Sequence, residues 1–179
     1  KTALNSAKTS LKSSSETFPR FAISRVICSN KSSSFIFLRI SEAVEGPKAI
    51  KSAATFWEKA YADCPQSSKN IYIYGPRIIG YQIKTSKDPA QKEKLFEKMM
   101  KVYDDRIKYF GNDRKQGKNY IMGRKAIDYV EYVPESRDPM KSQAYKWLSD
   151  VIEAQGSACE ASVFQQYFLQ TEQKRDYHH

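Results

Sequence analysis

The stretch AATFWEKAYADCP, residues 53–65, contains the pattern that decides the fold. Ala53 and Ala60 lie on either side of Trp57 at helical spacing, and Pro65 follows. Small residues allow two helices to approach closely, and a bulky ring between them fills the space at the contact. Because the residue before a proline avoids the helical conformation, the helix should stop near residue 64. The stretch therefore predicts the closing half of a helical hairpin.

The same spacing recurs twice further along the chain, beginning at residues 99 and 144. In each copy, a large residue and a helix-stopping residue follow at the same intervals. The copy that begins at residue 99 departs from the pattern at Met99 and at Arg106, where a small residue is expected. A glycine preceded by a large residue occurs in each intervening segment, at Gly75 and Gly123. A recurring two-helix unit is typical of a helical solenoid, in which hairpins bury their apolar faces only by stacking. The predicted packing positions are Ala53, Trp57, Ala60, Gly75, Met99, Tyr103, Gly123, Ala144 and Leu148.

Apolar periodicity and breaker residues predict helices over residues 35–45, 47–64, 68–86, 87–111, 119–133, 138–156 and 157–175. The segment 68–86 is ambiguous, since its alternating Tyr and Ile would also suit a strand. We favour a helix because Gly75 falls where the first helix of a hairpin needs a small residue.

Capping residues support several of these boundaries. Asp88 and Asp138 each precede a proline, the arrangement expected at a helix start. Gly111 and Gly156 are natural helix stops. Ser157 with Glu160 three residues later has the spacing of a capping box.

The basic excess is concentrated at the N-terminus. Residues 1–40 hold seven Lys or Arg and one acidic residue, whereas the whole chain has a formal charge of +10. We expect residues 1–33, rich in Ser and Lys, to form an irregular solvated segment. The alternative is an electrostatic binder of nucleic acid or another polyanion, although no aromatic interleaving or recognition motif supports it. No apolar run approaches the roughly 20 residues of a membrane span.

Residue types needed for common catalytic chemistry are missing. The two histidines, His178 and His179, stand at the C-terminus and resemble the start of a purification tag. No phosphate-binding or dinucleotide-binding glycine motif occurs. The three cysteines, at 28, 64 and 159, are too scattered for a zinc site, though one pair could bridge in an oxidising compartment. We therefore expect no metal, no cofactor and no enzymatic activity.

The repeated pattern is similar to the tetratricopeptide repeat. In that motif a large residue and glycine mark the first helix, and small, aromatic and small residues before a proline mark the second. The stretches CPQSSKNIYIYGPRI, KDPAQKEKL, VYDDRIKYFGND and YIMGRKAIDYVEY further resemble exported tetratricopeptide proteins of Bacteroidota over about residues 50–175. The units exceed the usual 34 residues by about a dozen. The resemblance implies a periplasmic or envelope-associated protein that binds a peptide or partner subunit.

We thus expect an all-α chain in three parts. Residues 1–33 form the basic segment, 34–175 a short tetratricopeptide-like α-solenoid, and 176–179 a tail. The last helix should act as a polar cap that turns Gln165, Gln166 and Gln170 outward, because a terminal repeat must stay soluble. The N-terminal end has no equivalent, so self-association there is expected.

The resemblance also implies a binding surface, because the first helix of each unit lines the concave face in such repeats. Its predicted groove residues are Tyr72, Arg77, Tyr120, Arg124 and Asp128. Tyrosine with arginine is a composition common among binding anchors. The alternative is structural: the tyrosines pack between hairpins, and Arg124 pairs with Asp128 four residues on.

Overall fold

The computed structural model describes residues 47–177, and this part of the chain is helical throughout, without a strand. The expected all-α class is therefore confirmed. The predicted helix over 35–45, the segment 1–33 and both histidines lie outside the described residues. The elements are α3 (Pro47–Asp63), α4 (Asn70–Thr85), α5 (Pro89–Phe110), α6 (Lys118–Tyr132), α7 (Ser142–Gln155), the 3₁₀ helix η2 (Gly156–Ala158) and α8 (Ala161–Tyr177).

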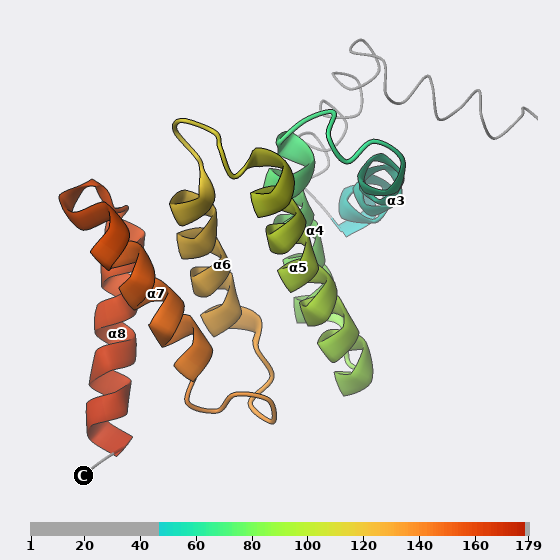
Figure 1. Cartoon of the computed structure of the whole chain (residues 1–179). Coiled ribbons are helices and arrows are strands. Elements are labelled where there is room, and N and C mark those ends of the chain that lie inside the picture. Colours follow the sequence, from blue (N-terminus) through green and yellow to red (C-terminus); the bar gives the residue numbers. More distant parts are fainter. Residues whose placement is uncertain (1–46, 178–179) are drawn as a thin grey trace, which may run out of the picture.

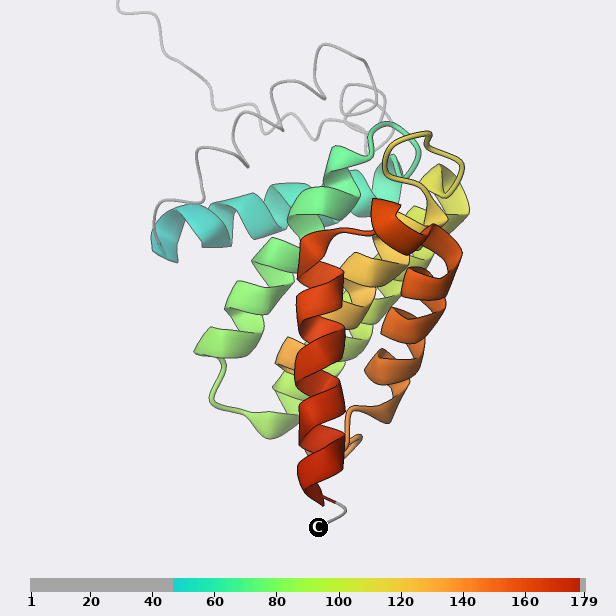
Figure 2. The same cartoon turned by 90° about the vertical axis from the view of Figure 1, so that its left-hand side faces the viewer.

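Each helix packs against the next one along the chain, from α3 to α8 (Figure 1). The most extensive contacts join α4 to α5 and α6 to α7. These are the two complete hairpins that the repeated pattern predicts within the described residues. Helix α3 runs crosswise to the later helices (Figure 2).

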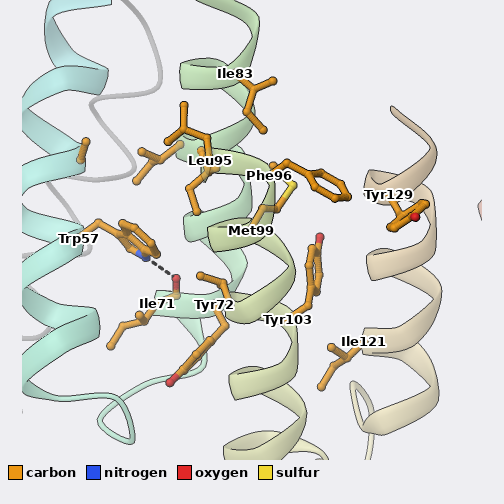
Figure 3. Close-up of a cluster of buried hydrophobic side chains, with 14 of the residues drawn as sticks. Trp57, Ile71, Tyr72, Ile83, Leu95, Phe96, Met99, Tyr103, Ile121 and Tyr129 are labelled. Atoms are coloured by element: carbon orange, nitrogen blue, oxygen red, sulfur yellow. Dashed lines mark hydrogen bonds between the residues drawn. The ribbon is translucent and has the colours of Figure 1, made fainter. Parts of the chain in front are cut away.

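The ambiguous segment 68–86 is helical, as α4. Trp57 of α3 explains how this helix is held. Its side chain is 1% exposed, and its indole N–H donates to the carbonyl oxygen of Ile71 at 2.7 Å (Figure 3). A Cβ atom built on Gly75 would lie 2.7 Å from the indole ring, which is too close for a real contact. Only glycine therefore lets α4 approach the ring this closely.

Aromatic contacts continue the core from α5 to α7. Phe96 and Tyr103 extend from α5 into the space that faces α6 (Figure 3). The rings of Phe96 and Tyr129 meet edge to face at 5.3 Å, and Tyr129 meets Trp147 of α7 in the same way at 5.2 Å. Buried Lys125 completes this contact, since its ammonium lies 4.7 Å from the Trp147 ring and 2.5 Å from the Asp104 carboxylate.

The predicted packing positions lie in the interior, but the repeated units are not equivalent. The buried ones are Ala53, Trp57, Ala60, Gly75, Met99, Tyr103, Gly123, Ala144 and Leu148. Gly75 faces the tryptophan of the preceding helix. Gly123 instead faces the last helix, where a Cβ would lie 2.8 Å from Val163. Arg106, the departure from the small-residue pattern, is also buried, with 4% of its surface exposed.

Two predicted helix starts are wrong. Helix α7 begins at Ser142, not 138, because Lys141 has a left-handed backbone with φ of 49°. The Asp138 carboxylate still accepts hydrogen bonds from the N–H groups of Ser142 and Gln143 at 3.0 and 3.2 Å. Pro139 therefore lies in the turn before the helix. Ser157 lies in η2 and α8 begins at Ala161, so the expected capping box is absent. By contrast, Asp88 caps α5 by accepting from the Ala90 N–H.

Helix α8 covers α7 and α6 but does not present the polar outer face that we expected. Gln165 is exposed as predicted and Gln166 is half-buried, but Gln170 is 3% exposed rather than turned outward. Three large apolar side chains of the helix are exposed instead: Phe164, Phe168 and Leu169. The prediction of a polar cap is therefore wrong for this face. Self-association through the N-terminal end stays a prediction, because residues 1–46 lie outside the described part.

The two described cysteines differ in state. Cys64, at the end of α3, is disulfide-bonded, whereas Cys159 is a free thiol. Cys159 is buried beside Val163, as expected of a small apolar residue, and burial raises the pKa of its thiol.

We expect Gly75→Ala to lower the free energy of unfolding by about 1–2 kcal/mol, because the cost of overpacking against the indole exceeds the gain in helix propensity. The indole cannot easily shift, since its N–H is bonded to Ile71. Denaturant unfolding measures the change. In a Trp57→Leu background the same substitution should cost less; an equal cost in both backgrounds would contradict the contact.

Candidate binding groove

A hollow of about 300 Å³ lies between α4, α5 and α6. All five residues that the sequence predicts for the groove line it. The complete lining is Tyr72, Ile73, Pro76 and Arg77 from α4, Tyr103 and Arg106 from α5, Gln116 from the following loop, and Tyr120, Arg124, Asp128 and Tyr132 from α6. The hollow is therefore rich in tyrosine and arginine.

Tyr72 lines this hollow from the core of the protein. Its side chain is fully buried, and its hydroxyl donates to the Pro65 carbonyl oxygen at 2.9 Å. The ring also meets Tyr61 and Phe110, at centroid distances of 5.9 and 5.6 Å. Burial raises the pKa of Tyr72 above its ordinary value. Tyr72 thus has the packing role of the structural alternative, and it is unsuited to direct contact with a ligand.

Asp128 bonds to a tyrosine, not to the arginine on its own helix. The Tyr103 hydroxyl donates to its carboxylate at 2.5 Å, whereas Arg124 makes no ion pair with it. The Arg124–Asp128 ion pair of the structural alternative is therefore not formed. Burial raises the pKa of Asp128, although the Tyr103 hydrogen bond and the charge of Arg124 oppose that rise. Glu131, on the same helix, pairs instead with Lys84 at 2.5 Å.

Arg106 is the one charged residue of the groove lining that the sequence analysis did not predict. Its Nη2 atom donates to Gln116 at 3.3 Å, and its guanidinium lies 5.6 Å from the Tyr120 ring centre. Its Nε atom is buried without a hydrogen-bond partner in the described structure. Burial and the nearby charge of Arg124 lower the pKa of Arg106. The sequence did contain a signal for this residue, because an arginine stands where the repeated pattern expects a small residue.

The loop between α5 and α6 holds Gln116 beside Arg106. The Asp113 carboxylate accepts from the N–H groups of Lys115 and Gln116 at 2.9 and 2.8 Å and pairs with Lys69 at 3.0 Å. These bonds lower the pKa of Asp113 to about 2. Asp113 therefore stays charged, and can keep these bonds, at the pH values at which proteins usually work.

Two further arginines give the groove a positive balance. Arg77 is exposed, with its guanidinium 5.9 Å from the Tyr74 ring centre. Arg124 is half-buried, and no hydrogen bond to it is found among the described residues. With Arg106, three guanidinium groups face one carboxylate, that of Asp128. Such an arrangement suits an anionic or strongly polar ligand.

No family model, curated protein or solved structure matches the chain. Over residues 47–177, no group of three or more His, Cys, Asp or Glu is placed to hold a metal ion. Within the same range, no helix has the length and apolarity needed to cross a membrane. The function is therefore inferred from the groove itself.

We expect Tyr103→Phe to lower the free energy of unfolding by about 1–3 kcal/mol at neutral pH, because the buried Asp128 carboxylate loses its donor. The folded-state pKa of Asp128 already lies above its ordinary value, and it should rise further in the variant. The penalty belongs to the charged carboxylate, so it should shrink as the pH falls below the raised pKa.

Denaturant unfolding of both proteins between about pH 4 and pH 7 measures this dependence. Asp128→Asn is the matched background, since it removes the charge and keeps the shape. A Tyr103→Phe cost that is independent of pH, or equal in the Asp128→Asn background, would contradict the role of the pair.

Proposed function

We propose that the chain is a non-enzymatic interaction scaffold that binds a peptide or a partner subunit in the groove between α4, α5 and α6. The observation that carries the proposal is the gathering of Arg77, Arg106 and Arg124 with tyrosine rings around one hollow. Arginine and tyrosine are the side chains that most often dominate binding energy at protein interfaces.

The helical architecture supports this function. Helices stacked in sequence order leave a face lined by side chains from several units, and repeat proteins bind extended partners on such faces. We propose that the stack is a short tetratricopeptide-like solenoid. The close fit of Trp57 against Gly75 supports that assignment, whereas the different surroundings of Gly123 and the buried Arg106 depart from a regular repeat.

We further propose that the protein acts in the bacterial cell envelope. The resemblance of residues 50–175 to exported proteins supports this compartment. So does the disulfide at Cys64, because disulfides persist in oxidising compartments and are rare in the cytosol.

The proposed function is tested by affinity capture from an envelope extract, with the intact chain as bait and an Arg77→Ala/Arg124→Ala variant beside it. Neither arginine forms an ion pair in the described structure, so the variant should fold normally. We expect the variant to capture about tenfold less partner than the intact chain, or even less, since two anchoring guanidinium groups are removed.

The matched control is Lys87→Ala/Arg114→Ala, which removes the same charge from exposed positions outside the groove lining. A partner that both variants retain would place the interaction on another surface and contradict the groove. Capture of nucleic acid alone, released by salt, would favour the basic N-terminal segment instead.

A further inference from the structure

We propose that Arg106 and Arg124 form an oxyanion subsite that takes a carboxylate group of the bound peptide, from an Asp or Glu side chain or from a C-terminus. This inference rests on the proposed function and names the chemistry that the groove recognises. It depends on the state of Arg106 more than on any other observation.

Arg106 is a buried cation that forms no ion pair within residues 47–177, although the more distant Asp113 carboxylate still acts on it through its charge. Only 4% of its surface is exposed, its Nε atom has no hydrogen bond, and its one hydrogen-bond partner in the described structure is the neutral amide of Gln116 at 3.3 Å. Burying a charge is costly unless it is paired, and buried polar atoms nearly always have partners. An unpaired guanidinium that lines a hollow therefore indicates that its partner is a ligand.

Arg124 supplies a second guanidinium group to the subsite. It lines the same hollow and lies near enough for its charge to lower the pKa of Arg106. Two like charges held together in the free protein repel each other, and an anion between them relieves the repulsion. Planar guanidinium groups match the geometry of carboxylate oxygens and form charge-assisted hydrogen bonds with them. The exposed Arg77 at the rim adds attraction at longer range.

The remaining lining favours a carboxylate over a phosphate group. Asp128 lies in the same hollow, and its carboxylate already accepts from Tyr103. A dianionic phosphate would meet this negative charge with twice the repulsion of a monoanion. The tyrosine rings of Tyr120 and Tyr132 offer apolar surface and hydroxyl groups beside the arginines, which suits a peptide more than a free inorganic ion.

A purely structural role for Arg106 predicts a different result. If the guanidinium stabilised the fold, replacing it with an apolar side chain of similar length would lower stability. If it is held ready for a ligand, the same change removes an unpaired buried charge and should raise stability while abolishing recognition. Arg106→Met therefore separates the two roles, because methionine retains most of the length of the side chain.

The experiment is binding of the full chain to an array of random dodecapeptides, each printed with a free and with an amidated C-terminus. We expect bound peptides to be enriched in Asp and Glu, or in free C-termini, and the two printed forms distinguish these sources. Arg106→Met and Arg124→Gln should each reduce binding of the enriched peptides by about tenfold or more. Arg114→Met, an equal charge change on the exposed loop, should retain it.

Thermal unfolding is measured on the same variants. Arg106→Met should have a higher midpoint than the original chain. Should it fail to fold, the test uses Arg124→Gln and Arg106→Lys; lysine keeps the charge but not the planar guanidinium group.

Binding without preference for carboxylates, or a preference that survives both arginine changes, overturns the subsite and leaves the scaffold intact. Preference for phosphoserine over glutamate overturns the choice of carboxylate. No peptide bound by the original chain overturns the scaffold and the subsite together.

Discussion

The contact between Trp57 and Gly75 fixes the first step of the helical stack, and the groove depends on it. The indole lies against bare backbone and donates its N–H to Ile71, so α4 is held in both distance and rotation. That rotation sets the direction of the residues that follow Gly75. Pro76 and Arg77 reach the groove from there, while Tyr72 is held beneath it. A packing constraint between α3 and α4 thus positions residues of a surface that α4 shares with α5 and α6.

The sequence was informative where a local pattern has one physical solution. Long apolar periodicity located α5 closely, and Asp88 followed by a proline marked its start correctly. Prediction failed where a polar side chain can serve several backbone positions. Asp138 does bond to helical N–H groups, but those of residues 142 and 143, because the left-handed backbone at Lys141 delays the helix. Nothing in the composition of residues 138–141 distinguishes the two outcomes.

The groove shows the same division between pattern and packing. Its predicted residues line one hollow because helical spacing and the repeat resemblance together place them on one face. Helical spacing does not show how deeply each side chain is buried. Tyr72 was therefore expected to face the groove, whereas its side chain is fully buried. Tyr103 and Gln116 reach the hollow from a different helix and a loop, and only the tertiary arrangement joins them to Asp128 and Arg106. The polar outer face predicted for α8 is wrong because the apolar residues of this helix do not gather on one face. Phe168 is therefore exposed.

Gly80 makes room for a tyrosine ring that the groove shares with a second hollow. A Cβ atom at this position would lie 2.7 Å from the Tyr132 hydroxyl, so the Tyr132 side chain of α6 reaches the bare backbone of α4 here. Tyr132 also borders a neighbouring hollow of about 310 Å³ that is lined by Lys84 and Pro134. Any side chain at residue 80 must displace this ring, which lines both hollows. A substitution at residue 80, three residues along α4 from Arg77, would therefore alter the lining of both hollows at once.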